Sequence, residues 1–210
     1  MIRRLLSPVF VSFLLVLVAC AEQGPPVPDA TLAAAAERTV GAESFRVRLT
    51  VTDGREQHES QVDYVAPDRV RIKLRPRGET IWIGGDAYYA TPERPARFVL
   101  VETSCENPLQ VAVPALDVLG HATDVRRNGP DFVFRSSRDV AMTGEARIED
   151  GYVASLLLRY RLPDVDRTVI ERYSFSGFGR STLIRRPDAS SVRGAAPNQG
   201  SLVPCPEKQP

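Results

Sequence analysis

Few residues of this 210-residue chain have the types and spacing that covalent chemistry requires. Asp117 and His121 are four residues apart and would share one face of a helix, where they could activate a serine such as Ser104. A surface pair at a helix end explains the same spacing, because a histidine there complements the helix dipole. The chain has no Gly-Xaa-Ser-Xaa-Gly nucleophile elbow. We therefore expect a protein that is not an enzyme.

Metal and nucleic-acid chemistry are disfavoured as well. Two histidines and three cysteines are too few for a zinc ribbon or a cysteine-ligated iron–sulfur cluster. Glu56, His58 and Glu59 could ligate a metal, but they adjoin a turn, where solvated side chains are the simpler interpretation. The formal net charge of +1 offers no basic field for DNA or RNA. We predict no metal, no cofactor and no nucleic-acid partner.

The N-terminus has the pattern of a targeting segment. A basic start at Arg3 and Arg4 precedes an apolar run over residues 9–19, and the run ends at Cys20. A spanning helix needs about 20 apolar residues, so this run is too short. A basic start, an apolar centre and a small-residue end are typical of a secretory signal peptide, which we place at residues 1–19.

Residues 17–20, Leu-Val-Ala-Cys, resemble the lipobox of bacterial lipoproteins. The resemblance implies that Cys20 becomes an acylated N-terminus and that the chain is anchored at the extracytoplasmic face of the cell membrane. If the host has two membranes, Ala21 resembles the class that is sorted to the periplasmic face of the outer membrane. The alternative is an ordinary signal peptide that is cleaved nearby, with Cys20 incidental.

Lipidation of Cys20 would leave Cys105 and Cys205, which have one possible pairing. We predict a disulfide between them, since an odd number of cysteines is unfavourable in an oxidising compartment. The bond would hold a Pro/Gly/Ser-rich C-terminal tail, residues 187–210, against the domain. The alternative is two free thiols.

The rest of the chain indicates one mainly β domain at residues 29–186, after a flexible proline-rich tether at 20–28. An alanine-rich helix is expected at 29–40, and Pro114 should divide a second helical region into pieces at 108–112 and 114–121. Alternating segments and Asp-Gly or Asn-Gly turns are typical of an antiparallel meander. The expected strands are 45–52, 57–65, 68–75, 79–83, 87–91, 97–102, 124–127, 132–136, 144–149, 152–162 and 168–178.

One face of this sheet is expected to be apolar and the other to carry arginines such as Arg46 and Arg48. Only the first helix and the broken segment 108–121 are available to cover the apolar face. Two short helices are a thin cover for about ten strands. Either the sheet curls tightly and fills itself, or a cavity remains.

The chain resembles the lipid-binding lipoproteins of actinobacteria of the LppX/LprG type, and also the related carriers LolA and LolB and the envelope regulator RseB. The likeness rests on the lipobox, on strand 45–52 after a helix, and on the segments 64–72 and 81–89. Residues 107–119 occupy the position of that group's lid helices. The resemblance implies an α+β fold in which a curved antiparallel half-barrel carries an N-terminal helix and a short helical lid over its concave face. Pro114 departs from the group and changes the shape expected for the lid.

The resemblance also implies a function, the binding or carriage of an acylated lipid, glycolipid or lipoprotein in an apolar cavity. The alternatives are a regulator like RseB, acting through a membrane-protein partner, and a structural lipoprotein without a ligand. The residues expected to line the cavity are Phe45, Val47, Leu49, Val70, Ile72, Ile81, Ile83, Leu116 and Leu119.

Overall fold

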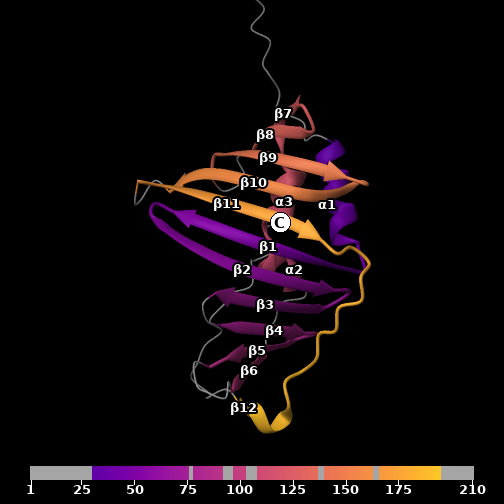
Figure 1. Ribbon diagram of the computed structural model, residues 1–210, viewed down its shortest axis with the longest axis vertical. Coiled ribbons are helices and arrows are strands. Elements are labelled where there is room, and N and C mark those ends of the chain that lie inside the picture. The colour runs from indigo at the N-terminus through magenta and orange to yellow at the C-terminus, as the bar shows by residue number, and fades with distance from the viewer. Residues whose placement is uncertain are drawn as a thin grey trace, which may run out of the picture.

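The computed structural model describes residues 30–75, 78–91, 97–102, 108–136, 140–162 and 166–194. In these ranges, three α-helices lie against one face of a single large sheet (Figure 1). The helices are α1 (Ala30–Val40), α2 (Pro108–Ala112) and α3 (Ala115–Gly120). The strands are β1 (Ser44–Asp53), β2 (Glu56–Val65), β3 (Arg69–Arg75), β4 (Glu79–Ile83), β5 (Asp86–Ala90), β6 (Phe98–Glu102), β7 (Thr123–Asn128), β8 (Asp131–Ser136), β9 (Met142–Glu149), β10 (Tyr152–Leu162), β11 (Arg167–Ser176) and β12 (Val192–Gly194).

The sheet has twelve strands in the order β12-β6-β5-β4-β3-β2-β1-β11-β10-β9-β8-β7. Two antiparallel meanders, β1–β6 and β7–β11, join where β1 pairs with β11 and Val47 lies opposite Phe175. The sheet is curved and does not close, because β12 and β7 are its two edges. The expected mainly β, antiparallel half-barrel with few helices is therefore confirmed.

The local sequence explains the positions of the helices and turns. The helix α1 ends before Gly41, whose N–H donates to the carbonyl oxygen of Glu37 at 2.8 Å. Pro114 separates α2 from α3, as expected from its effect on a helix interior. Asp150 and Gly151 both have positive φ in the β9–β10 hairpin, which suits the twist of the flanking strands.

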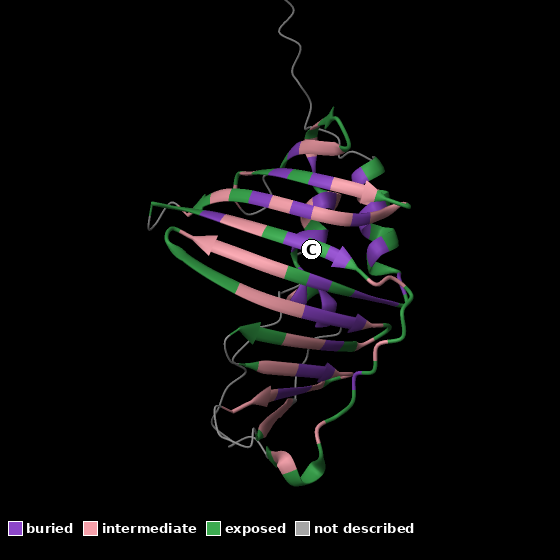
Figure 2. Cartoon of the chain, in the orientation of Figure 1, coloured by how far each residue is buried: buried purple, intermediate pink, exposed green. Residues whose placement is uncertain are grey.

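Alternation along the strands divides the sheet into an inner face, which lies under α1–α3, and an outer face. One core cluster joins the inner face to the helices, with Phe45, Val47 and Val70 from the sheet and Leu32 and Leu119 from α1 and α3. Figure 2 shows that the buried residues of β1 and β2 gather at the strand ends near α1, whereas the other ends are less buried. The helices therefore cover only part of the inner face.

Ile81 and Ile83 do not lie on the inner face, so that part of the sequence prediction is wrong. Val70 pairs with Trp82 across the β3–β4 ladder, which places Trp82 inside and both isoleucines outside. Segment 79–83 has apolar residues at odd and even positions, so its own alternation does not decide which side is buried. The pairing register decides it, because a shift of one residue exchanges the two faces.

Ile81 is buried by the chain that follows β11, which we name the C-terminal strap (residues 177–194). The strap runs past the ends of β1–β5 and finishes as β12, which pairs with β6 in parallel (Figure 1). Ile81 and Tyr88 pack against Ile184 of the strap in a second apolar cluster. Arg69 also donates to the carbonyl oxygen of Ile184, at 3.3 Å. The sheet thus extends beyond the boundary at residue 186 that the sequence indicated.

Candidate functional site

Five of the residues expected to line a cavity form a packed core. Phe45, Val47, Val70, Leu116 and Leu119 are each 3% exposed or less and belong to one cluster of contacting side chains. A void wide enough for a hydrocarbon chain would leave part of its wall accessible. At these positions the sheet and the helices therefore fill the space between them.

Leu49 and Ile72, the remaining inner-face candidates, are only partly buried. Both pack at the margin of the core cluster, towards the strand ends that the helices leave uncovered (Figure 2). Leu74 follows on the same face and is 51% exposed. The inner face thus changes from a dry core under the helices to an accessible apolar surface beyond them.

An apolar groove of about 250 Å³ lies between α1 and the α2–α3 pair. Its floor is formed by Leu109, Val113 and Leu116, which belong to the same core cluster as Val47 and Leu119. The groove therefore borders the core from the helical side, and Leu116 is the one residue of the sequence-based set that lines it.

The groove exists because the facing helix positions carry small side chains. Ala33 and Ala36 of α1 and Gly120 of α3 lack the volume to fill the space between the helices. Pro114 bends the chain between α2 and α3, so Leu109 and Leu116 both reach the floor from different helical pieces. The helical regions 29–40 and 108–121 were predicted, but the groove residues Leu109 and Val113 were not singled out.

Three polar side chains, Glu37, Gln110 and Asp117, complete the groove lining. The two acids are on opposite walls, one on α1 and one on α3. Their negative charge disfavours a free carboxylate next to them. The groove is therefore chemically suited to a neutral apolar chain that carries its polar group elsewhere.

A polar cluster occupies the less covered part of the inner face. Glu171 accepts hydrogen bonds from the hydroxyls of Tyr160, at 2.7 Å, and Tyr173, at 2.5 Å. Burial, together with the Glu171 hydrogen bond and charge, raises the pKa of both tyrosines, so both remain protonated donors. The cluster holds one carboxylate fixed beside apolar residues, and no residue of it was anticipated from the sequence.

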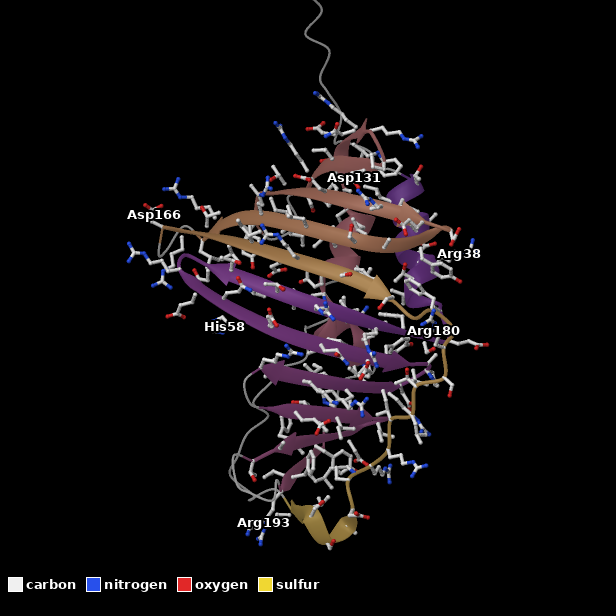
Figure 3. The ribbon with its side chains drawn as sticks, in the orientation of Figure 1. Arg38, His58, Asp131, Asp166, Arg180 and Arg193 are labelled. Atoms are coloured by element: carbon white, nitrogen blue, oxygen red, sulfur yellow. The ribbon has the colours of Figure 1, made fainter. Side chains whose placement is uncertain are left out.

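Two of the three residues considered for catalysis lie in the described part of the chain. Asp117 lines the groove, His121 is exposed beyond the end of α3, and Ser104 lies outside the described residues. His58 and Glu56 are exposed and 3.6 Å apart (Figure 3 labels His58). Within the described ranges no three His, Cys, Asp or Glu side chains are grouped so that they could hold a metal ion.

Several predictions concern residues outside the described part of the chain. They are the signal peptide at 1–19, lipidation of Cys20, the tether at 20–28 and the Cys105–Cys205 disulfide. In the ranges that the structure describes, every helix is too short or too polar to span a bilayer.

Comparison with known proteins gives a weak structural similarity. No family model matches the chain, and no curated protein matches it. The crystal structure of a DUF1329 family protein from Desulfovibrio piger is similar, with a TM-score of 0.37 and 8% sequence identity over 72% of this chain and 92% of that chain. A likeness at this level does not bear on function.

Proposed function

We propose that the protein binds the acyl chain of a lipid or of another acylated molecule in the groove between α1 and α2–α3. We propose further that lipidated Cys20 anchors it at the extracytoplasmic face of a membrane. One observation carries the first proposal, namely that Leu109, Val113 and Leu116 belong to the packed core and also form the floor of an open groove. An acyl chain lying there would contact this floor and would cover Val40, which lines the groove and is 38% exposed.

The energetics suit an acyl ligand. Each buried methylene contributes roughly 0.8 kcal/mol, so a sixteen-carbon chain gains roughly 13 kcal/mol before the costs of binding are subtracted. The groove volume of about 250 Å³ is below the range of roughly 300–1,000 Å³ that is usual for a ligand site. A long chain therefore requires α1 to separate further from α2–α3, which would open the route from the groove floor to Leu119 and Val47.

The polar lining narrows the ligand class. Glu37 and Asp117 would repel a free fatty-acid carboxylate at the groove, whereas an ester or amide carries no charge. Gln110 offers both a donor and an acceptor to such a linkage. An esterified or amide-linked acyl chain is the ligand that these side chains favour.

The acyl-binding proposal is tested by a matched pair of substitutions on α1. Ala33 lines the groove and is partly buried, whereas Ala34 is exposed on the same helix and does not line it. Ala33→Trp should fill the groove and abolish binding of a fluorescent sixteen-carbon acyl ester, measured by titration. Ala34→Trp should bind as the unmodified protein does, and circular dichroism should show both variants folded. Equal binding by the two variants would exclude the groove as the site.

Membrane anchoring is tested separately. Cys20→Ser should lose incorporation of labelled palmitate and should leave the membrane fraction of the host. Mass spectrometry of an organic extract of the purified protein should then show whether a lipid remains bound without the anchor. Palmitate incorporation that persists in Cys20→Ser would refute lipidation at this residue.

A further inference from the structure

A second pocket, of about 600 Å³, lies at the end of the sheet where β8–β11 meet their connections. Its lining includes three arginines, Arg135, Arg159 and Arg161, and the hydroxyl-bearing residues Ser136, Thr143 and Thr168. Among the described lining residues there is no aspartate or glutamate. Figure 3 shows this end of the sheet, with Asp166 labelled at the projecting end of β10–β11.

Strand register brings the arginines together. Arg135, Thr143 and Arg159 are directly opposite one another across β8, β9 and β10, so the two arginines flank a threonine in one row. Arg161 follows two residues after Arg159 on the same face of β10 and lies opposite Thr168. Neighbouring strands are about 4.8 Å apart, so the three arginine side chains are long enough to contact one bound anion together.

The arginines keep hydrogen-bonding capacity for a further anion. Arg135 contacts Asp124 at 3.6 Å and Arg159 contacts Glu145 at 3.5 Å, and all four side chains are largely exposed. Arg161 pairs with Asp166. A guanidinium has five N–H donors, so one carboxylate partner leaves donors free for another oxygen. None of the three carboxylates lines the pocket.

Threonine hydroxyls lie on the same face of the sheet as the arginines. Thr143 lies between Arg135 and Arg159 in the row, and Thr168 lies opposite Arg161. Both threonines are exposed, so their hydroxyls are accessible to an oxygen atom of a ligand in the pocket. Ser136 also lines the pocket, but it follows Arg135 by one residue, and its side chain therefore belongs to the inner face with that of Phe134.

We propose that this pocket binds a phosphate group, from a lipid headgroup or from a soluble phosphate ester. A tetrahedral phosphate offers enough oxygens to accept from two or three guanidinium groups and a hydroxyl together, whereas a carboxylate has only two oxygens. The pocket is distinct in its residues from the groove between α1 and α2–α3. The proposal is therefore independent of acyl binding there, and either can fail without the other.

Isothermal titration of the full chain with inorganic phosphate tests the proposal. Saturable binding is expected, and loss of each arginine should weaken it about tenfold, because one charge-assisted contact is removed. Arg135→Gln with Arg159→Gln is the main variant, and Thr143→Val tests the hydroxyl between them with a smaller expected loss. Arg48→Gln is the matched control, since Arg48 is an exposed arginine on β1 outside the pocket.

A second arm identifies the source of the phosphate. Vesicles containing phosphatidic acid are compared with vesicles in which diacylglycerol replaces it. Binding of inorganic phosphate alone supports a soluble ester, and binding to the phosphatidic acid vesicles as well supports a headgroup. Two results would overturn the proposal. One is the absence of binding to both inorganic phosphate and the phosphatidic acid vesicles. The other is a loss of affinity in Arg48→Gln as large as in the double variant, which would indicate non-specific attraction. The titration of Ala33→Trp with the acyl ester tests a different site, so none of these outcomes changes its interpretation.

Discussion

Thr39 of α1 accepts a hydrogen bond from the backbone N–H of Val153 on β10, at 2.9 Å, across 114 residues of sequence. The pairing of β9 with β10 is irregular between Val153 and Ser155, and the threonine hydroxyl satisfies the buried Val153 N–H there. The same hydroxyl donates to the carbonyl oxygen of Ala35 at 2.8 Å. This contact fixes the C-terminal end of α1, and with it one wall of the groove, to the sheet.

Thr39→Val should therefore destabilise the protein although it preserves side-chain shape. It leaves the Val153 N–H buried without a partner, which costs about 1–3 kcal/mol. Urea unfolding measures the free energy, and hydrogen exchange should show faster exchange at the Val153 amide. Thr39→Ser is the control, since it keeps the hydroxyl. Equal stabilities of the valine and serine variants would contradict this role for the hydroxyl.

Asp63 links three strands on the outer face. Its carboxylate is 1% exposed and accepts hydrogen bonds from Arg46 on β1, at 2.6 Å, and from Arg71 on β3, at 2.8 Å. Asp63→Asn removes the charge that both guanidinium groups face. We expect a loss of about 2 kcal/mol, less than for a fully buried pair because Arg46 is half exposed. Arg46→Gln should cost less, since Arg71 remains to pair with Asp63.

The contribution of Asp63 should depend on pH. Burial raises the pKa of this carboxyl, but the hydrogen bonds and charges of Arg46 and Arg71 outweigh burial and hold the pKa below its usual value. A lowered folded-state pKa means that the stabilisation is present above the unfolded pKa of about 4 and is lost as pH falls through the folded value. The stability difference between the unmodified protein and Asp63→Asn should therefore shrink in acid. A difference that stays constant with pH would argue against an ionised Asp63.

The strands and helices were predictable because their signals are local. Phe45 and Val47 alternate with arginines within β1, and the effect of Pro114 on a helix depends only on its own neighbours. The orientation of Ile81 was not predictable, because the β3–β4 register and the covering strap determine it. The strand β12 has only three residues, too few for a readable alternation.

The candidate sites were harder to predict than the fold. Whether Val47 lines a cavity or fills a core depends on the volumes of side chains from α1, α2 and α3, which the spacing along β1 does not report. The pocket proposed to bind phosphate combines residues from five strands, β7–β11, so the alternation within any one strand does not reveal it. Alternation did identify the inner-face positions Leu49 and Ile72, which remain partly accessible.

Gly144 lies opposite Phe134 in the β8–β9 ladder, and the aromatic ring covers the glycine. A Cβ atom at residue 144 would lie 2.1 Å from the Phe134 ring, and Phe134 is buried. Gly144→Ala should therefore destabilise the protein by about 1–3 kcal/mol through overpacking. Thermal or urea unfolding measures the loss.

A double-mutant cycle separates this clash from a general effect of replacing glycine. Phe134→Leu should recover part of the loss in the Gly144→Ala background, so the two changes should cost less together than the sum of their separate effects. Gly120→Ala is the matched control, since its Cβ would meet no atom within 4 Å and the residue is helical. It should be neutral or slightly stabilising. Strict additivity in the cycle would rule out the clash.

The parallel pairing of β12 with β6 bears on the two remaining cysteines. Gly194 lies opposite Leu100, so the chain leaves both strands in the same direction at one edge of the sheet. Cys105 and Cys205 follow these strands and lie outside the described residues. We expect them to form a disulfide that closes a loop of about 100 residues and contributes roughly 4.7 kcal/mol in the chain-entropy model.

Peptide mapping without reduction should recover one species that contains both Cys105 and Cys205. Reductant should lower the melting temperature of the unmodified protein but not that of Cys205→Ser. The double variant Cys105→Ser/Cys205→Ser should have the same melting temperature as Cys205→Ser, because the bond is already absent in both. Reduction should also speed hydrogen exchange in β12, since the bond restrains the strap that contains it. Alkylation of both thiols in unreduced native protein would show that no disulfide forms, and the stability of the strap would then rest on Ile184 and the β12–β6 ladder.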